Sequence, residues 1–333
     1  MRVLIVKMSS LGDVVHTLPA LTDAAAALPG IRFDWVVEEA FAEIPTWHPA
    51  VDNVIPIALR RWRKRPFTMW YSDEWRSCRN RLRSEPYDAV IDAQGLLKSA
   101  FIARTARGTR YGYDRDSARE GLASLAYHQG IAVAREQHAV ERTRQLFASA
   151  LAYPVPQERG DYGVRANLQA QSRNESSDLL FFHGTAREEK LWPADHWFSL
   201  AELATTAGYR VWLPWGSDAE RARADAIAAQ VNGAEVLPRL DLLGLAGMLL
   251  DVDGAVAVDT GLGHLAAALD VPTVSLYGPT RTALIGAYGG NQVHIQSPLG
   301  RDDTDDPAAM MASIQPAAVW AKLKTILPVG AMQ

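Results

Sequence analysis

Apolar and polar positions alternate along the chain in two kinds of pattern. Short, continuous apolar runs are typical of buried parallel strands, and apolar residues three or four positions apart are typical of helices that face a core. In the first half the strand-like runs are RVLIVK, RFDWVV, NVIPIA and YDAVIDA, with weaker candidates after them. Helical patterns follow at 14–28, 39–47, 72–85, 96–106 and 138–151.

The alternation starts again after a polar, irregular stretch between Tyr153 and Ser177. The later strand-like runs are DLLFFHG, YRVWLPWG, GAVAVD and PTVSLYG, and the helical patterns lie at 194–207, 217–230, 241–250, 261–270 and 316–326. Such alternation predicts parallel sheets with helices on both faces. Its repetition predicts two Rossmann-like domains, 1–160 and 178–333, facing a central cleft and joined by a linker at 161–177.

The composition argues against disulfide-rich, zinc-binding, membrane-spanning and secreted proteins. The single cysteine, Cys78, excludes a disulfide framework and argues against a Cys/His zinc site. No apolar run reaches the roughly 18–20 residues of a membrane-spanning helix, and the N-terminus lacks the pattern of a signal peptide. These features predict a soluble protein of a reducing cytoplasm.

Charge is distributed unevenly between the two halves. Residues 1–160 hold 22 Lys and Arg against 18 Asp and Glu, whereas residues 161–333 hold 12 against 20. The segment RRWRKR at 60–65 carries five positive charges. It suits phosphates and carboxylates of a ligand, with Trp62 against sugar or lipid, although a solvated face is the common alternative. Nucleic acid is disfavoured because the chain is acidic overall and lacks a recognition motif.

The first loop after a strand, MSSLGD, ends in a carboxylate, although dinucleotide folds often bind a phosphate at this turn. The residues alone leave two roles open for Asp13. A helix cap is the commoner role, and the other is a catalytic base. A position at a helix N-terminus predicts a lowered pKa for Asp13.

Three strand ends of the second half carry residues that suit a nucleotide. GAVAVD ends at Asp259 and is followed by Thr260, Gly261, Gly263 and His264, where glycines and free helix N–H groups fit a diphosphate. DLLFFHG is followed by Thr185, Arg187 and Lys190, which suit phosphate oxygens. YRVWLPWG is followed by Glu220, which suits a ribose diol. Helix capping and a solvated loop are the structural alternatives for these residues.

Several segments carry a resemblance to a known family. MRVLIVKMSSLGDVVHTLPAL, FDWVVEE, RRWRK, YDAVIDAQGLLKSA, HAVERT, LPWG and VDTGLGHLAAALDVPTVSLYGPT are similar to segments of the lipopolysaccharide heptosyltransferases of glycosyltransferase family 9, of the type that adds the first inner-core heptose. The resemblance extends over essentially the whole chain. It implies a GT-B fold and inverting transfer of heptose from ADP-L-glycero-D-manno-heptose to the first Kdo of Kdo2-lipid A, with no metal and no cofactor.

The resemblance also implies roles for individual residues. Asp13 would be the base. The residues expected around ADP-heptose are Thr185, Lys190, Glu220, Asp259, Thr260, Gly261 and His264. The residues expected around the acceptor are Ser10, Gly12, Arg60, Arg61, Arg63, Lys64, Lys98 and Arg119. One departure is Ala186, where relatives often have a second threonine.

The resemblance further implies peripheral contact with the anionic cytoplasmic face of the inner membrane of a Gram-negative bacterium, through basic and aromatic residues near 60–75. Two alternatives remain at the level of sequence. One is another two-Rossmann sugar-nucleotide enzyme, such as the second heptosyltransferase or an epimerase. The other is a non-catalytic, two-lobed protein that binds an anion.

Overall fold

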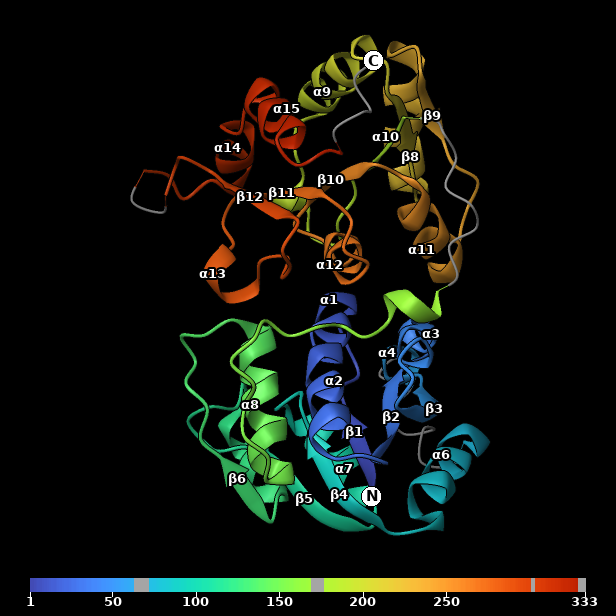
Figure 1. Ribbon diagram of the computed structural model, residues 1–333, viewed down its shortest axis with the longest axis vertical. Coiled ribbons are helices and arrows are strands. Elements are labelled where there is room, and N and C mark those ends of the chain that lie inside the picture. The colour runs from blue at the N-terminus through green and yellow to red at the C-terminus, as the bar shows by residue number, and fades with distance from the viewer. Residues whose placement is uncertain (63–71, 169–176, 301–302, 329–333) are drawn as a thin grey trace. The chain divides into compact units, whose positions relative to one another are not determined.

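The computed structural model describes residues 1–62, 72–168, 177–300 and 303–328, except for the side chain of Arg60 (Figure 1). The chain divides into two compact units, unit 1 at Met1–Asn167 and unit 2 at Leu168–Gln333. Each unit has its own sheet and its own core.

Unit 1 is built on a six-stranded parallel sheet in the order β3-β2-β1-β4-β5-β6. Its strands are β1 (Arg2–Val6), β2 (Arg32–Glu38), β3 (Val51–Ile57), β4 (Tyr87–Asp92), β5 (Gly108–Tyr113) and β6 (Gln129–Ile131). Its helices are α1 (Leu11–Val15), α2 (Leu18–Ala27), α3 (Glu43–Thr46), α4 (Leu59–Trp62), α6 (Asp73–Ser84), α7 (Leu97–Thr105) and α8 (Ala139–Leu151), with 3-10 turns η1 (Glu39–Phe41), η2 (Gly121–Ala126) and η3 (Arg165–Asn167).

The helix predicted at 14–28 is wrong as a single element, because the chain forms α1 and α2 in its place. Pro19 lies in the first turn of α2, where a missing N–H breaks no hydrogen bond. α2 lies beside α8 (Figure 1), and a buried ion pair between Arg144 Nε and Asp23 Oδ2, 2.6 Å apart, joins the two helices. The break therefore leaves α1 as a separate, short element directly after β1.

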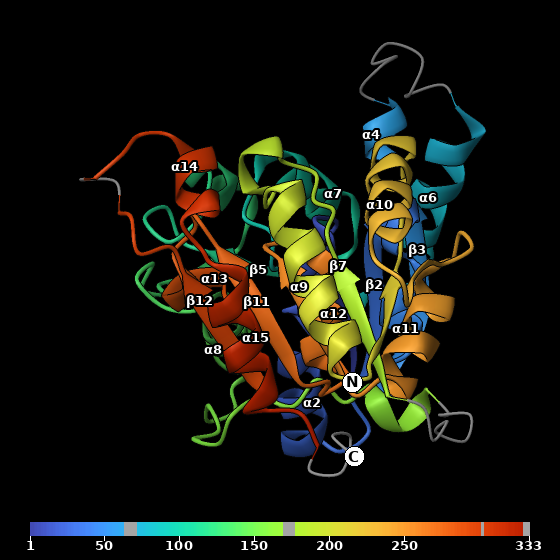
Figure 2. The ribbon, with the colours of Figure 1, turned by 90° about the horizontal axis from the view of Figure 1, so that it is seen from above.

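Unit 2 is built on a second six-stranded parallel sheet, in the order β12-β11-β10-β7-β8-β9. Its strands are β7 (Asp178–Phe182), β8 (Arg210–Leu213), β9 (Ala234–Val236), β10 (Gly254–Val258), β11 (Thr273–Tyr277) and β12 (Gln292–Gln296). Its helices are α9 (Ala194–Thr206), α10 (Asp218–Gln230), α11 (Leu242–Asp251), α12 (Gly261–Ala268), α13 (Thr282–Ile285), α14 (Pro307–Ala312) and α15 (Pro316–Lys324), with a 3-10 turn η4 (Glu188–Lys190). Figure 2 shows α9 and α15 side by side, and their apolar faces share one core with the sheet.

The two sheets have the same strand order. Numbered from the first strand of each unit, both read 3-2-1-4-5-6, which is the Rossmann order. The predicted pair of Rossmann-like α/β folds is therefore confirmed. In this fold, ligands bind beyond the carboxyl ends of the strands where the order reverses. These positions lie after β1 and β4 in unit 1, and after β7 and β10 in unit 2.

Part of the segment expected as a linker packs on unit 1. Tyr162 and Val164 are buried, and the side-chain amide of Asn167 donates to the carbonyl of Trp47 at 2.8 Å. Residues 169–176 lie outside the described residues. Among the described helices, none combines the length and the apolar character needed to cross a bilayer.

Candidate functional site

In unit 1 the loops after β1 and β4 are tied together by Gln94. Its side-chain oxygen accepts hydrogen bonds from the backbone N–H groups of Met8 (2.9 Å) and Ser9 (3.2 Å). Lys7, the first residue after β1, donates from Nζ to the carbonyl of Ala93 at 2.8 Å. The side chains of Lys7 and Gln94 are both buried. The loop that carries Asp13 is thus fixed from the neighbouring strand.

The carboxylate of Asp13 is held by three residues. The backbone N–H and the hydroxyl of Ser10 donate to Asp13 Oδ2 at 3.0 and 3.2 Å. Arg119 Nη2 donates to Oδ1 at 3.1 Å, and Lys7 Nζ lies 3.9 Å from the same oxygen. Only 16% of the Asp13 side chain is exposed. Asp13 is the third residue of α1, in a capping box with Ser10, so it is not the N-cap residue of this helix.

The charges around Asp13 decide its protonation state. Burial alone would raise the pKa of Asp13, but the positive charges of Lys7 and Arg119 and the hydrogen bonds from Ser10 outweigh burial and lower it. The lowered pKa agrees with the prediction, but its cause is different, since α1 has only five residues. Asp13 is ionised at neutral pH. Its ionised form stabilises the fold above the pKa of the unfolded chain, and this stabilisation is lost as the pH falls through the lower, folded-state pKa.

The other residues expected on the acceptor side have different surroundings. Gly12 is buried in α1, and Lys98 is exposed on α7. Arg61 pairs with Glu74 (2.9 Å) and Glu39 (3.2 Å).

Most of the basic stretch lies outside the described residues. Arg63 and Lys64 lie outside the described residues, as does the side chain of Arg60. The expected placement of Trp62 against sugar or lipid is wrong. Trp62 is 6% exposed and belongs to the unit 1 core, where its ring packs edge-on against Trp75.

In unit 2 the residues after β7 and β10 meet at Asp259. The hydroxyl of Thr185 donates to the carbonyl of Asp259 at 3.1 Å. Lys190, at the end of η4, places Nζ 2.6 Å from Asp259 Oδ2. The side chains of Lys190 and Asp259 are only 12% and 7% exposed, so their charges are weakly screened by solvent. Lys190 is thereby held beside the first turn of α12.

Glu220 belongs to the same end of the sheet. Its carboxylate accepts hydrogen bonds from the backbone N–H groups of Gly216 (2.8 Å) and Ser217 (3.1 Å), which forms a capping box for α10. A Cβ atom on Gly184 would lie 2.3 Å from a carboxylate oxygen of Glu220. Gly184 therefore lets the end of β7 approach Glu220, a role that sequence reasoning missed.

The start of α12 differs in part from the prediction. Thr260 is the N-cap residue, but its hydroxyl makes no capping hydrogen bond, and Gly261 is the first helical residue. His264 is buried, with 6% exposed. Gly263 has a packing role that the sequence did not indicate. A Cβ on Gly263 would lie 3.1 Å from the Cβ of Ala257, so this glycine serves the packing of α12 on β10.

Comparison with known proteins agrees with this arrangement of two Rossmann units. A family model, glycosyltransferase family 9 (heptosyltransferase), matches residues 75–310. The chain belongs to glycosyltransferase family 9. It is 59% identical to lipopolysaccharide heptosyltransferase 1 of Pseudomonas aeruginosa, with 89% of this chain and 84% of the relative covered. It is 51% identical to the enzyme of the same name from Escherichia coli, with 90% and 94% covered.

Solved structures of family members are similar over almost the whole chain. The structure of E. coli heptosyltransferase WaaC with ADP has a TM-score of 0.89 and 46% identity, with 98% of this chain and 99% of that chain covered. The structure with ADP-2-deoxy-2-fluoro heptose has a TM-score of 0.86, 45% identity and the same coverage. This family 9 glycosyltransferase therefore has the GT-B architecture that the sequence predicted.

The Lys190–Asp259 pair gives a testable prediction for unit 2. Lys190→Met leaves the buried Asp259 carboxylate without its partner and should lower the free energy of unfolding by about 3–5 kcal/mol. Adding Asp259→Asn should restore part of this loss, because the uncompensated charge is removed. Urea unfolding measures both effects. Arg187→Met, which breaks an exposed pair with Glu189 nearby, is the control and should cost less than about 1 kcal/mol. Equal losses for Lys190→Met and Arg187→Met would contradict the assigned burial.

Proposed function

We propose that this family 9 glycosyltransferase transfers L-glycero-D-manno-heptose from ADP-heptose to the first Kdo of Kdo2-lipid A, with inversion at the anomeric carbon. The observation that carries the proposal is the Asp13 carboxylate held by Lys7 and Arg119 at the unit 1 switch point, in a chain to which four relatives named heptosyltransferase 1 are 51–59% identical. Relatives named heptosyltransferase 2 are 27% identical. The difference favours the first heptosyl transfer over the second.

We propose that unit 2 binds the ADP part of the donor. The WaaC structures named with ADP and with an ADP-heptose analogue support a donor of this class. Lys190 and the N-terminus of α12, at Thr260 and Gly261, would bind the diphosphate, with His264 as a further donor. Asp259 holds Lys190 in place. Thr185 and Glu220 would bind phosphate and ribose. As the bond to the sugar breaks, negative charge grows on the diphosphate, and these cationic and N–H groups stabilise it.

We propose that Asp13 in unit 1 is the general base. As the acceptor oxygen forms its bond to the anomeric carbon, the proton of that hydroxyl passes to the Asp13 carboxylate, and ADP leaves with the electron pair of the broken bond. A carboxylate with a lowered pKa is a weak base, so proton transfer accompanies late bond formation. Arg119, bonded to Asp13, would contact the anionic acceptor, together with the basic residues at 60–64 and Lys98.

Membrane contact is part of the proposal. The acceptor carries lipid chains, so we propose a peripheral position at the cytoplasmic face of the inner membrane. Positive charges near an anionic surface contribute about 1 kcal/mol each.

Asp13→Asn tests the assigned base. The amide keeps the size of the side chain but cannot accept the proton, so kcat for ADP release, with ADP-heptose and Kdo2-lipid A as substrates, should fall about 10²–10⁴-fold. ADP affinity, measured by calorimetry, should stay the same, because unit 2 is unchanged. Asp116→Asn, at an exposed position of unit 1, is the matched control and should keep full activity. A fully active Asp13→Asn variant would remove Asp13 from the mechanism. Absence of ADP release from the unmodified protein would favour a binding protein.

A further inference from the structure

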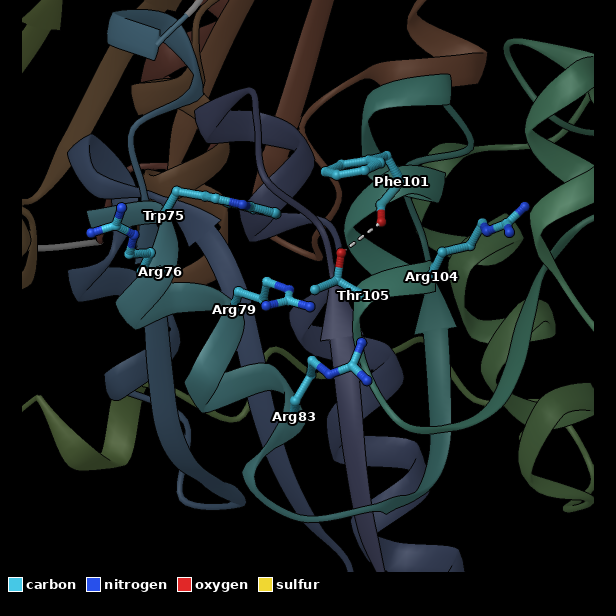
Figure 3. A pocket seen from close by; sticks show the side chains of 7 residues that line it. All are labelled: Trp75, Arg76, Arg79, Arg83, Phe101, Arg104 and Thr105. Atoms are coloured by element: carbon cyan, nitrogen blue, oxygen red, sulfur yellow. Dashed lines mark hydrogen bonds between the residues drawn. The ribbon is translucent and has the colours of Figure 1, made fainter. Parts of the chain in front are cut away.

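A pocket of about 520 Å³ is lined by α6 and α7 of unit 1, and no residue of the Asp13 loop lines it (Figure 3). Its lining residues are Trp75, Arg76, Arg79, Arg83, Phe101, Arg104 and Thr105. The lining thus contains four arginines and no acidic residue.

The arginines come from two helices. Arg76, Arg79 and Arg83 are three and four positions apart on α6, so they share one face of that helix, and Arg104 projects from α7 (Figure 3). Arg76 forms an exposed ion pair with Asp73 at 3.1 Å. Within the described residues, the other three guanidinium groups form no hydrogen bond or ion pair. They are exposed and available to an anionic ligand.

Aromatic rings form one wall of the pocket. The rings of Trp75 and Phe101 stack with centroids 5.5 Å apart at an angle of 27°. Trp75 is buried, whereas Phe101 is 38% exposed. The pocket therefore offers apolar contact beside its positive charge.

An exposed apolar surface continues from this wall. Among the described residues seven large apolar side chains are exposed, and four of them lie on α7 and η2: Leu97, Phe101, Leu122 and Leu125. The two elements pack against each other. Leu97 and Phe101 are one turn apart on α7, on the face that carries Thr105. Leu125 is 79% exposed. Apolar side chains beside a basic rim are typical of surfaces that bind at a lipid interface.

We propose that the α6–α7 pocket binds the phosphate head groups of anionic phospholipids, and that the exposed side chains of α7 and η2 enter the boundary between head groups and acyl chains. A guanidinium group can bind two oxygens of one phosphate at the same time. The lining holds no carboxylate that would repel a phosphate. This surface gives the proposed peripheral position a specific contact. It needs neither heptose transfer nor the Asp13 site.

Flotation with lipid vesicles tests the proposal on the full chain. The unmodified protein should float with vesicles of phosphatidylcholine and phosphatidylglycerol. With vesicles of phosphatidylcholine alone, it should remain in the unbound fraction. Arg79→Gln/Arg83→Gln/Arg104→Gln should weaken the partition about 100-fold at low salt. The matched control, Arg159→Gln/Arg239→Gln/Lys322→Gln, removes the same charge from exposed positions elsewhere and should change the partition less than about threefold.

Two further measurements distinguish a loss of lipid binding from unfolding and from a loss of catalysis. Thermal unfolding should show both triple variants folded, since their side chains are exposed. ADP release with a water-soluble, deacylated acceptor should be equal in the Arg79/Arg83/Arg104 variant and the unmodified protein. Four results would each overturn the proposal. The first two are unchanged flotation of the Arg79/Arg83/Arg104 variant and an equal loss of flotation in the control variant. The other two are release of the protein from vesicles by millimolar inorganic phosphate or ADP, and a loss of this variant's activity on the soluble acceptor.

Discussion

The loop after β1 depends on one electrostatic constraint, the pairing of the Asp13 carboxylate with Lys7 and Arg119. A mostly buried carboxylate is protonated easily unless positive charge lies beside it. Arg119 supplies that charge from the segment after β5, and Lys7 supplies it from the end of the central strand. Burial lowers the pKa of Lys7, and the charge of Asp13 opposes this lowering. Because Lys7 is also bonded to Ala93, its ammonium group cannot move away without breaking a second contact.

The two switch points differ in where the carboxylate lies relative to the following helix. In unit 1 the first helical turn after β1 contains a carboxylate, Asp13, and the cationic side chains of Lys7 and Arg119 are paired with it. In unit 2 the pair of Lys190 and Asp259 sits beside a helix N-terminus that has no anionic side chain in its first turn. The proposed binding of the diphosphate in unit 2 is consistent with this difference, because in unit 1 the phosphates would meet the carboxylate of the first helical turn. The proposed division of donor and acceptor between the two units would explain why this nucleotide-type fold has a carboxylate at its first turn.

Much of the fold could be predicted from the sequence, because central parallel strands are buried on both faces and appear as apolar runs. RVLIV and GAVAV are of this kind. β12 escapes such prediction because QVHIQ has partly exposed, polar positions, and β9 escapes it because it has three residues. The break between α1 and α2 is hidden because the apolar spacing continues through it.

The contact between Thr185 and Asp259 could be anticipated from the sequence, because both residues lie within three positions of a strand end. The partners of Asp13 were harder to find. Arg119 lies more than 100 positions away from it, and Gln94, which fixes the loop that carries Asp13, lies more than 80 positions away. Their contacts exist only once β1, β4 and β5 pair. Trp62 was misplaced because its charged neighbours suggested exposure, whereas its ring fills the core of unit 1.

The pKa of Asp13 is the most direct test of this electrostatic constraint. Carbon-13 NMR of labelled aspartate, with Asp13→Asn to assign the resonance, measures the titration in the folded protein. We predict a pKa below the ordinary aspartate value, and a higher pKa in Lys7→Met, because the buried positive charge is then absent. An Asp13 that titrates at or above the ordinary value, or one that does not respond to the loss of Lys7, would contradict the assigned pairing.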